Sequence, residues 1–308
     1  MNDSFRSDRR TFLRRMSALA GSSVALTAMP WLSVFGDSYA SGRAPSDRVR
    51  LGVIGVGDRG NALALHIKEL EKVANVQLAA VCDNYDPHYE RAIETAGPGV
   101  RAFKDHRELL EMNDLDGVLI ATPLHEHAHI TVDCYEAGLH VFCEKAMART
   151  IPDVRRMYDA HVESGNIMII GHQRLFNPIY LEAMERIRRG GLGPITQMRA
   201  YWHRNNDWRR EVPPGRPDLE RKINWRMYTE YSAGLLTELG SHHFQVANWV
   251  KDSQPVSVVA KGAINYWKDG REVYDNVACI FMYPDDMPLI YDSMISNKHY
   301  GLQVQVMG

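Results

Sequence analysis

The sequence has few of the features that mark a metal-binding, nucleic-acid-binding or membrane-spanning protein. Its 308 residues include only four cysteines, Cys82, Cys134, Cys143 and Cys279, with no CxxC spacing and no histidines at the intervals of a zinc site. Cys82 and Cys143 fall in predicted buried strands. We therefore expect inert core thiols and no metal site.

The sequence also lacks a large excess of positive or negative charge, and it lacks a long uninterrupted apolar run. The formal net charge is −2, and no basic stripe or aromatic-basic repeat could follow a phosphate backbone, which argues against nucleic acid as a partner. The apolar stretch from residue 16 to about 35 is broken by Gly, Ser, Thr and Pro30, and it falls short of the roughly 18 uninterrupted residues of a membrane span. The composition, 45% hydrophobic and 24% charged, is typical of a soluble globular chain with room for two domains.

Residues 1–40 predict an export signal. Arg9 and Arg10 belong to a twin-arginine pattern, a mildly apolar stretch follows, and Ser38-Tyr39-Ala40 offers a small-x-small cleavage site. We expect export of the folded protein to the periplasm, with residues 41–48 as a linker. An uncleaved anchor or a lipid-tethered form is the alternative.

A dinucleotide site is predicted where the first strand ends. Residues 49–54 form an apolar run, a complete GxGxxG follows, and then come a helical pattern and a second strand over 76–81. The loop residues that we expect to bind the cofactor are Gly55, Gly57, Asp58, Arg59 and Gly60. Asp83 lies roughly 20 residues further on, where a carboxylate accepts from ribose hydroxyls and repels a 2′-phosphate, which favours NAD over NADP. The alternative is a nucleotide-free domain with a Gly-rich turn.

The order of strands and helices predicts two domains. Over residues 49–174 strand and helix alternate with short connections, which indicates a Rossmann domain with a parallel sheet. Residues 175–308 contain one helix, long β-type stretches and a helical segment over 224–250, which indicates an α+β domain with an open, mostly antiparallel sheet. Because the last strand has no closing element after it, we expect the natural protein to continue.

Polar clusters follow the predicted parallel strands, at the edge where such sheets bind ligands. The clusters contain Thr122, Pro123, His125, His127, Glu144, Lys145, Gln173 and Arg174. We expect the residues from Thr122 to Lys145 in this list to contact the cofactor. Alternatively, one of the two histidines does no more than cap the following helix. Gln173 and Arg174 are candidates for substrate hydroxyls.

With these motifs in place, the chain resembles the Gfo/Idh/MocA family of dinucleotide-dependent sugar oxidoreductases. The resemblance rests on the glycine loop, Ala121-Thr122-Pro123, Cys143-Glu144-Lys145 and residues 238–242, Glu-Leu-Gly-Ser-His. It implies a Rossmann domain, a second domain whose sheet mediates homo-oligomerisation, and an active site between them. Lys145 corresponds to the family's lysine, and Glu238 and His242 to its acid and histidine. Ala146 stands where the family has proline, and Glu238 replaces the usual aspartate.

The same three residues are chemically suited to oxidise a secondary alcohol. Hydride transfer needs a base for the hydroxyl proton and a cation for the developing alkoxide. Glu238 and His242 are four residues apart and share one face of a helix, and Lys145 lies at a strand end. We expect these three to be catalytic. Their structural alternatives are a helix-surface acid, a core histidine and an exposed strand-end charge.

Aromatic and arginine side chains near the entrance of the predicted active site suit a sugar, although the tryptophans could equally be core or interface residues. They are Trp202, Arg204, Trp208, Trp225, Arg226 and Tyr228, of which Trp225 and Tyr228 are our candidates for substrate binding.

Export limits the reaction, because no cellular NAD pool restores the cofactor outside the cytoplasm. We therefore expect tightly held NAD and hydride transfer on a sugar or sugar derivative. A redox-neutral NAD-dependent glycoside hydrolase of the N-acetylgalactosaminidase type is one alternative. A non-catalytic sugar-binding protein on a Rossmann scaffold is the other.

Overall fold

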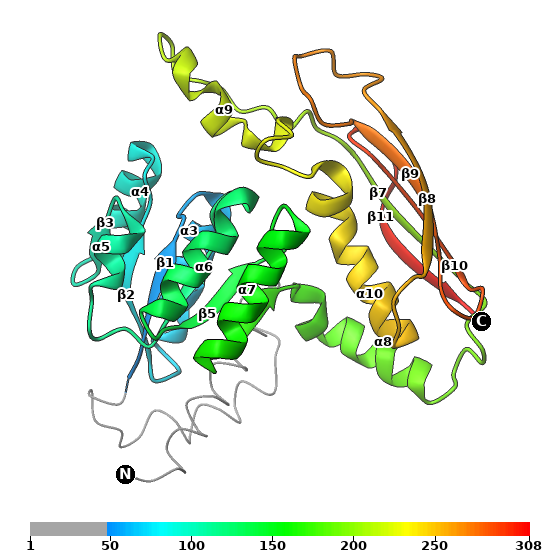
Figure 1. Ribbon diagram of the computed structural model, residues 1–308, viewed down its shortest axis with the longest axis horizontal. Coiled ribbons are helices and arrows are strands. Elements are labelled where there is room, and N and C mark those ends of the chain that lie inside the picture. The colour runs from blue at the N-terminus through cyan, green and yellow to red at the C-terminus, as the bar shows by residue number, and fades with distance from the viewer. Residues whose placement is uncertain (1–47) are drawn as a thin grey trace. The chain divides into compact units, whose positions relative to one another are not determined.

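The computed structural model of the protein describes residues 48–308, which form two compact units that divide after Phe176 (Figure 1). The predicted export signal lies outside the described residues. Each unit has its own sheet and its own core, and each is described by itself below.

The first unit is built on a six-stranded parallel sheet of order β3-β2-β1-β4-β5-β6. Its strands are β1 (Val49–Ile54), β2 (Val76–Cys82), β3 (Arg101–Phe103), β4 (Gly117–Ile120), β5 (His140–Glu144) and β6 (Met168–Gly171). The strand order reverses between β1 and β4, and the crevice at such a switch point is where doubly wound sheets bind ligands. The predicted Rossmann sheet is confirmed.

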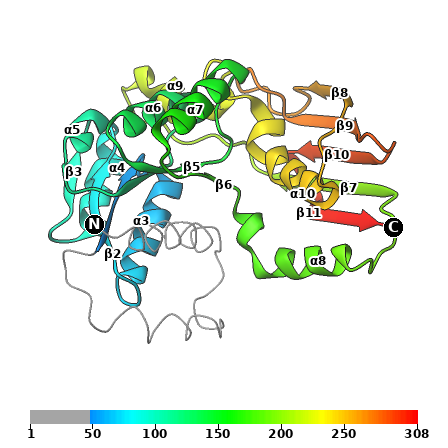
Figure 2. The same cartoon turned by 60° about the horizontal axis from the view of Figure 1, so that its bottom comes forward.

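Helices cover both faces of this sheet (Figure 2). They are α3 (Asp58–Leu70), α4 (Asp86–Ala96), α5 (His106–Leu110), α6 (His127–Glu136) and α7 (Ile151–Ser164), with short 3-10 turns at Leu124–Glu126 and Gln173–Phe176. Buried residues of α3 and α4, such as Leu63 and Ala92, share one core with the sheet. Those of α5, α6 and α7, such as Leu109 and Met157, share the other. Asp105 caps α5, since its side chain accepts from the N–H of Arg107.

The second unit is an open five-stranded sheet of order β11-β7-β10-β9-β8 with helices on one face. Its strands are β7 (Gln197–Asn205), β8 (Ser257–Ala263), β9 (Asn276–Met282), β10 (Pro288–Met294) and β11 (Ser296–Met307). Its helical elements are α8 (Pro178–Arg188), 3-10 turns at Pro217–Leu219 and Trp225–Met227, α9 (Glu220–Ile223), a π-helix at Leu236–Gly240 and α10 (Ser241–Lys251). Only the β7–β10 pairing is parallel, so the predicted, mostly antiparallel sheet is confirmed.

The helical segment predicted over residues 224–250 is wrong in its first half. The chain makes a short 3-10 turn, leaves helical structure after Met227, and resumes at Gly234, whose φ of +70° belongs to the left-handed region. A π-helical turn then leads directly into α10. The three-residue strand β3 was not predicted, because so short a strand carries no readable periodicity.

The four cysteines are buried and free, as predicted. Burial raises the pKa of the Cys82 thiol to about 12, so this group stays protonated and unreactive at neutral pH.

Candidate functional site

The glycine loop leaves no room for a side chain at its first and last glycines, Gly55 and Gly60. Gly55 has a φ of +82°, and a Cβ there would lie 2.7 Å from the backbone nitrogen of Thr122. A Cβ on Gly60 would lie 1.7 Å from the carbonyl oxygen of Gly55, so α3 can approach β1 this closely only with glycine. The loop thus exposes backbone at the start of a helix, and that arrangement fits a dinucleotide pyrophosphate.

Asp83 holds this loop in place. Its Oδ2 accepts from the N–H of Val56 at 2.8 Å, its Oδ1 accepts from the N–H of Tyr85 at 2.9 Å, and its side chain is 10% exposed. Each carboxylate oxygen has a second lone pair, so the same group can still accept from a ribose hydroxyl. The structure therefore gives the predicted ribose acceptor a bracing contact as well.

Two residues of α4 that the sequence did not single out also brace the loop. Arg91 donates from Nη2 to the carbonyl oxygen of Val56 at 3.0 Å, and its Nη1 lies 3.7 Å from the exposed carboxylate of Asp58. His88 places Nδ1 3.4 Å from Asp83. In the sequence, only their position on the helix that follows Asp83 could have indicated that they contact the loop.

His127 connects the ends of β4 and β5. It is buried, with Nδ1 2.8 Å from the carbonyl oxygen of Ala146 and Nε2 3.0 Å from that of Thr122. Because both partners accept, a neutral ring donates to only one of them at a time. The peptide bond between Lys145 and Ala146 is cis. His127 thus contacts the backbone that follows β4 and the backbone just beyond Lys145 at the end of β5.

His125 contacts a carboxylate just before the next helix. Its Nε2 lies 2.8 Å from Oε1 of Glu126, and Oε2 of the same carboxylate lies 3.2 Å from Nε2 of His129. Hydrogen bonds from His125 and His129 hold the pKa of Glu126 well below its usual range, and the bond to Glu126 raises the pKa of His129. Neither His125 nor His127 caps the helix with its side chain.

Charged side chains gather where β5 and β6 end. Glu144, which is 10% exposed, accepts from Nε of Arg59 in the glycine loop at 2.6 Å. Burial, followed by the positive charges of Lys145 and Arg174, lowers the pKa of His172 to about 4. His172 is therefore neutral at physiological pH. Arg174 is buried, and Gln173 begins the 3-10 turn that contains it.

The second unit carries the predicted acid and histidine on consecutive turns. Glu238 lies in the π-helix and His242 in the first turn of α10, and both are buried. Nε of Arg226 lies 3.3 Å from Oε2 of Glu238. The ring of His242 stacks on Trp202 of β7, with centroids 5.4 Å apart and planes 27° apart. π-helical turns are rare and often occur at functional sites.

The two residues predicted to bind substrate in this unit have different surroundings. The guanidinium of Arg226 lies 4.3 Å from the ring centroid of Trp225, which is half-buried. Tyr228 is buried, its hydroxyl donates to Glu220 at 2.7 Å, and Arg221 lies over its ring. Tyr228 therefore stabilises the loop before Gly234, while Trp225 keeps an accessible edge.

The predicted residues thus form two sets, one in each unit. Those for the cofactor, together with Lys145, Gln173 and Arg174, lie in the first unit, and Glu238, His242, Trp225 and Tyr228 lie in the second.

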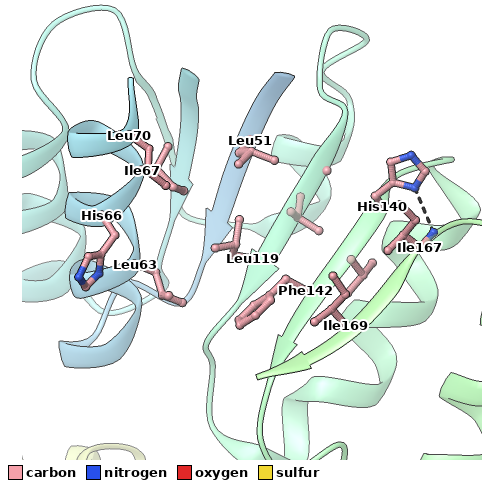
Figure 3. Close-up of a pocket in the computed structure, with 13 residues that line it drawn as sticks. Leu51, Leu63, His66, Ile67, Leu70, Leu119, His140, Phe142, Ile167 and Ile169 are labelled. Atoms are coloured by element: carbon pink, nitrogen blue, oxygen red, sulfur yellow. Dashed lines mark hydrogen bonds between the residues drawn. The ribbon is translucent and has the colours of Figure 1, made fainter. Parts of the chain in front are cut away.

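An apolar pocket in the first unit lies apart from these residues. It opens between α3 and strands β4 to β6, where Leu63 and Ile67 face Phe142 and Ile169 (Figure 3). None of the predicted site residues lines it. Its polar side chains are His66 and His140, and Nδ1 of His140 accepts from the N–H of Ile167 at 3.1 Å.

Residues 48–308 contain no group of three or more His, Cys, Asp or Glu placed to hold a metal ion. No helix in this part of the chain combines the length and the apolar character needed to cross a membrane.

Two family models match the chain, one in each unit. The oxidoreductase family model with an NAD-binding Rossmann fold, GFO_IDH_MocA, matches residues 49–172. The GFO/IDH/MocA C-terminal domain model matches residues 180–308. Together they account for nearly all of the part of the chain that the structure describes.

Relatives of two kinds share this similarity. Myo-inositol 2-dehydrogenase of Thermotoga maritima is 26% identical over 216 residues, which are 70% of this chain and 59% of that protein. Glycosyl hydrolase family 109 protein 1 of a Shewanella strain is 28% identical over 189 residues, which are 58% of this chain and 39% of that protein. The chain thus spans little more than half of the first relative and less than half of the second.

Solved structures share the fold. Levoglucosan dehydrogenase in complex with NADH and levoglucosan superimposes with a TM-score of 0.72 at 21% identity, covering 85% of this chain and 71% of that one. The WlbA dehydrogenase of Bordetella pertussis, in complex with NADH and UDP-GlcNAcA, gives the same TM-score and identity over 85% of this chain and 76% of that one.

Proposed function

Because the chain belongs to the Gfo/Idh/MocA oxidoreductase family, we propose that it is an NAD-dependent enzyme that oxidises or reduces a sugar or sugar derivative by hydride transfer. The observation that carries the proposal is the buried pair Glu238 and His242 in the second unit, in a chain whose first unit is an NAD-binding Rossmann domain with Lys145 at a strand end. A sugar-binding protein without catalysis has no need of this combination.

Each of these groups has a role in the oxidation of an alcohol. NAD, when bound, supplies the hydride acceptor. The Glu238–His242 pair accepts the hydroxyl proton, and the Lys145 ammonium stabilises the negative charge that develops on the alcohol oxygen. Asp83 accepts from the ribose hydroxyls, and the backbone at Gly55 to Gly60 binds the pyrophosphate.

We propose further that the enzyme is exported by the twin-arginine route with its cofactor already bound. The support is the sequence of residues 1–40, with Arg9 and Arg10 at its centre. Changing both arginines to lysine in a signal–reporter fusion is expected to retain the reporter in the cytoplasm. Export of the variant at the parental level would contradict this proposal.

A second candidate, a redox-neutral glycoside hydrolase, is supported by the similarity to the glycosyl hydrolase family 109 protein. In this reaction a ring hydroxyl is oxidised, the glycosidic substituent is eliminated, water adds, and the hydride returns to the sugar. Atoms balance with water as the only co-substrate, so an exported enzyme can repeat the cycle.

One experiment tests both candidates. Purified protein is denatured, and the released nucleotide is identified by mass spectrometry and quantified by absorbance. We expect NAD near one per chain. Native protein is then given sugars and nitrophenyl glycosides. Net NADH formation supports the dehydrogenase, whereas nitrophenol without net NADH supports the hydrolase. A protein without nucleotide that changes neither type of compound would contradict both.

A further inference from the structure

Two arginines interact with the carboxylate of Glu238 on the helix-covered face of the second sheet, but only one of them is bonded to it. Arg204 is the next-to-last residue of β7 and lies on the same face as Trp202, which stacks on His242. Arg226 pairs with Glu238, and Arg204 interacts electrostatically with both of them. This group of three, which we call the arginine cluster, carries an excess of one positive charge.

The charge of Arg204 is the unbalanced one. Its Nε is buried and has no hydrogen-bond partner among residues 48–308, and the one carboxylate that acts on it, Glu238, is bonded to Arg226. Burial, followed by repulsion from Arg226, lowers the pKa of Arg204, with Glu238 opposing the shift. A half-buried guanidinium whose buried Nε has no hydrogen-bond partner is costly for a fold, and the cost falls when an anion binds.

Indole rings fix both guanidinium groups from one side. Arg204 lies 5.3 Å from the ring centroid of Trp208, and Arg226 lies 4.3 Å from that of Trp225. Trp208 has a φ of +65°, which is uncommon for a bulky residue, and its N–H donates to Asn206 at 2.8 Å. This turn directs the indole back over β7. Stacked guanidinium groups keep their N–H edges free for planar, bidentate contacts with oxyanions.

We propose that the arginine cluster is an anion-binding subsite, and that the substrate is a sugar carrying an oxyanion group, either a carboxylate or a sulfate ester. The assignment rests on the proposed function, because it places the anion beside the predicted catalytic acid Glu238. A neutral sugar would leave the charge of Arg204 unbalanced. An anionic sugar supplies the missing carboxylate or sulfate oxygens and so binds in a defined orientation.

The test compares neutral and anionic sugars of the same ring configuration. The pairs are glucose with glucuronate, galactose with galacturonate, and N-acetylgalactosamine with its 6-sulfate, given as free sugars and as nitrophenyl glycosides. Because a hydrogen-bonded charge pair strengthens binding substantially, we expect kcat/KM to be at least about 10-fold higher for the anionic member of one pair, mainly through KM. Which pair responds distinguishes a carboxylate from a sulfate.

Variants connect the preference to Arg204. Arg204→Gln is expected to abolish the preference, so that kcat/KM becomes similar for the neutral and anionic members of the pair, and Arg204→Lys is expected to restore part of the preference. The matched control is Arg186→Gln, which removes an exposed arginine of α8 that pairs with Glu182. Circular dichroism melting verifies folding, and Arg226→Gln serves as the second variant if Arg204→Gln does not fold.

Binding without turnover separates this inference from the proposed function. Calorimetric titration with glucuronate, the 6-sulfate and inorganic sulfate is expected to show Arg204-dependent binding of one anionic sugar. Such binding in a protein that turns over no sugar would overturn the proposed function and support the subsite. Equal turnover of neutral and anionic sugars, unaffected by Arg204→Gln, would overturn the subsite alone. Inorganic sulfate that binds as tightly as the sugar would also overturn the substrate assignment.

Discussion

His172 makes stability depend on pH at the scale of a single residue. Its pKa falls from 6.5 to about 4 on folding, so the unfolded chain binds the proton more tightly. The stabilisation is complete above pH 6.5 and is lost as the pH falls toward 4. We expect the loss to be on the order of 3 kcal/mol. Urea unfolding at neutral pH and near pH 4.5 checks this.

A variant assigns that pH dependence to the imidazole. His172→Gln should have a smaller difference in the free energy of unfolding between the two pH values, because glutamine cannot be protonated there. The exposed His299→Gln is the control and should keep the full difference. An unchanged pH dependence in His172→Gln would show that other groups cause it.

Lys145 is the residue on which the proposed mechanism depends most. Removing its ammonium in Lys145→Ala removes the cation that stabilises the developing alkoxide, and we expect kcat to fall by about 100-fold or more. Because Lys145 is also expected to contact the cofactor, the NAD content is measured after denaturation and kcat is expressed per NAD-containing chain. Lys72→Ala, at an exposed position paired with Glu69, is the control. Full turnover by Lys145→Ala would exclude the assigned role.

At the scale of elements, the contact between α3 and β1 depends on Gly60. A Cβ there would meet the carbonyl oxygen of Gly55 at 1.7 Å, so Gly60→Ala forces the helix away from the strand. We expect a loss of about 3 kcal/mol or more in the free energy of unfolding, together with loss of bound NAD. Chemical denaturation and nucleotide analysis measure the two effects.

A second glycine provides the comparison within the same unit. Gly97 follows α4 with a φ of +75°, and a Cβ there would meet nothing within 4 Å. Gly97→Ala should therefore cost only the backbone strain of a region that nearly always holds glycine, about 1–3 kcal/mol, and should retain NAD. Equal effects of the two substitutions would contradict the steric explanation.

At the scale of the whole molecule, we expect a homo-oligomer formed through the second sheet. Val259 of β8 and Ile280 of β9 lie opposite each other, and they are 76% and 46% exposed, on the face away from α10. Burying this apolar face against a second copy removes it from water. Ile280→Asp should shift the protein to the monomer in light scattering after size exclusion. Val162→Asp on α7 is the control, and an oligomer that survives Ile280→Asp would contradict the expectation.

Local patterns determined much of this protein. Apolar runs, glycine spacing and the regular alternation of strand and helix predicted the parallel sheet, because each depends on residues close in sequence. The GxGxxG loop and Asp83 followed from the same logic. Glu238 and His242 were singled out through the family resemblance, and their separation of four residues is compatible with one shared helix face; their catalytic role stays a prediction.

The contacts that those residues make follow from the folded chain. The bond from Asp83 to Val56, the two carbonyl partners of His127 and the link between Arg226 and Glu238 join positions far apart in the chain. The break before Gly234 and the left-handed turn at Trp208 depend on how the second unit packs. The excess charge at Arg204 appears only when all neighbours are placed, because charge balance is a property of the folded surroundings and not of sequence spacing.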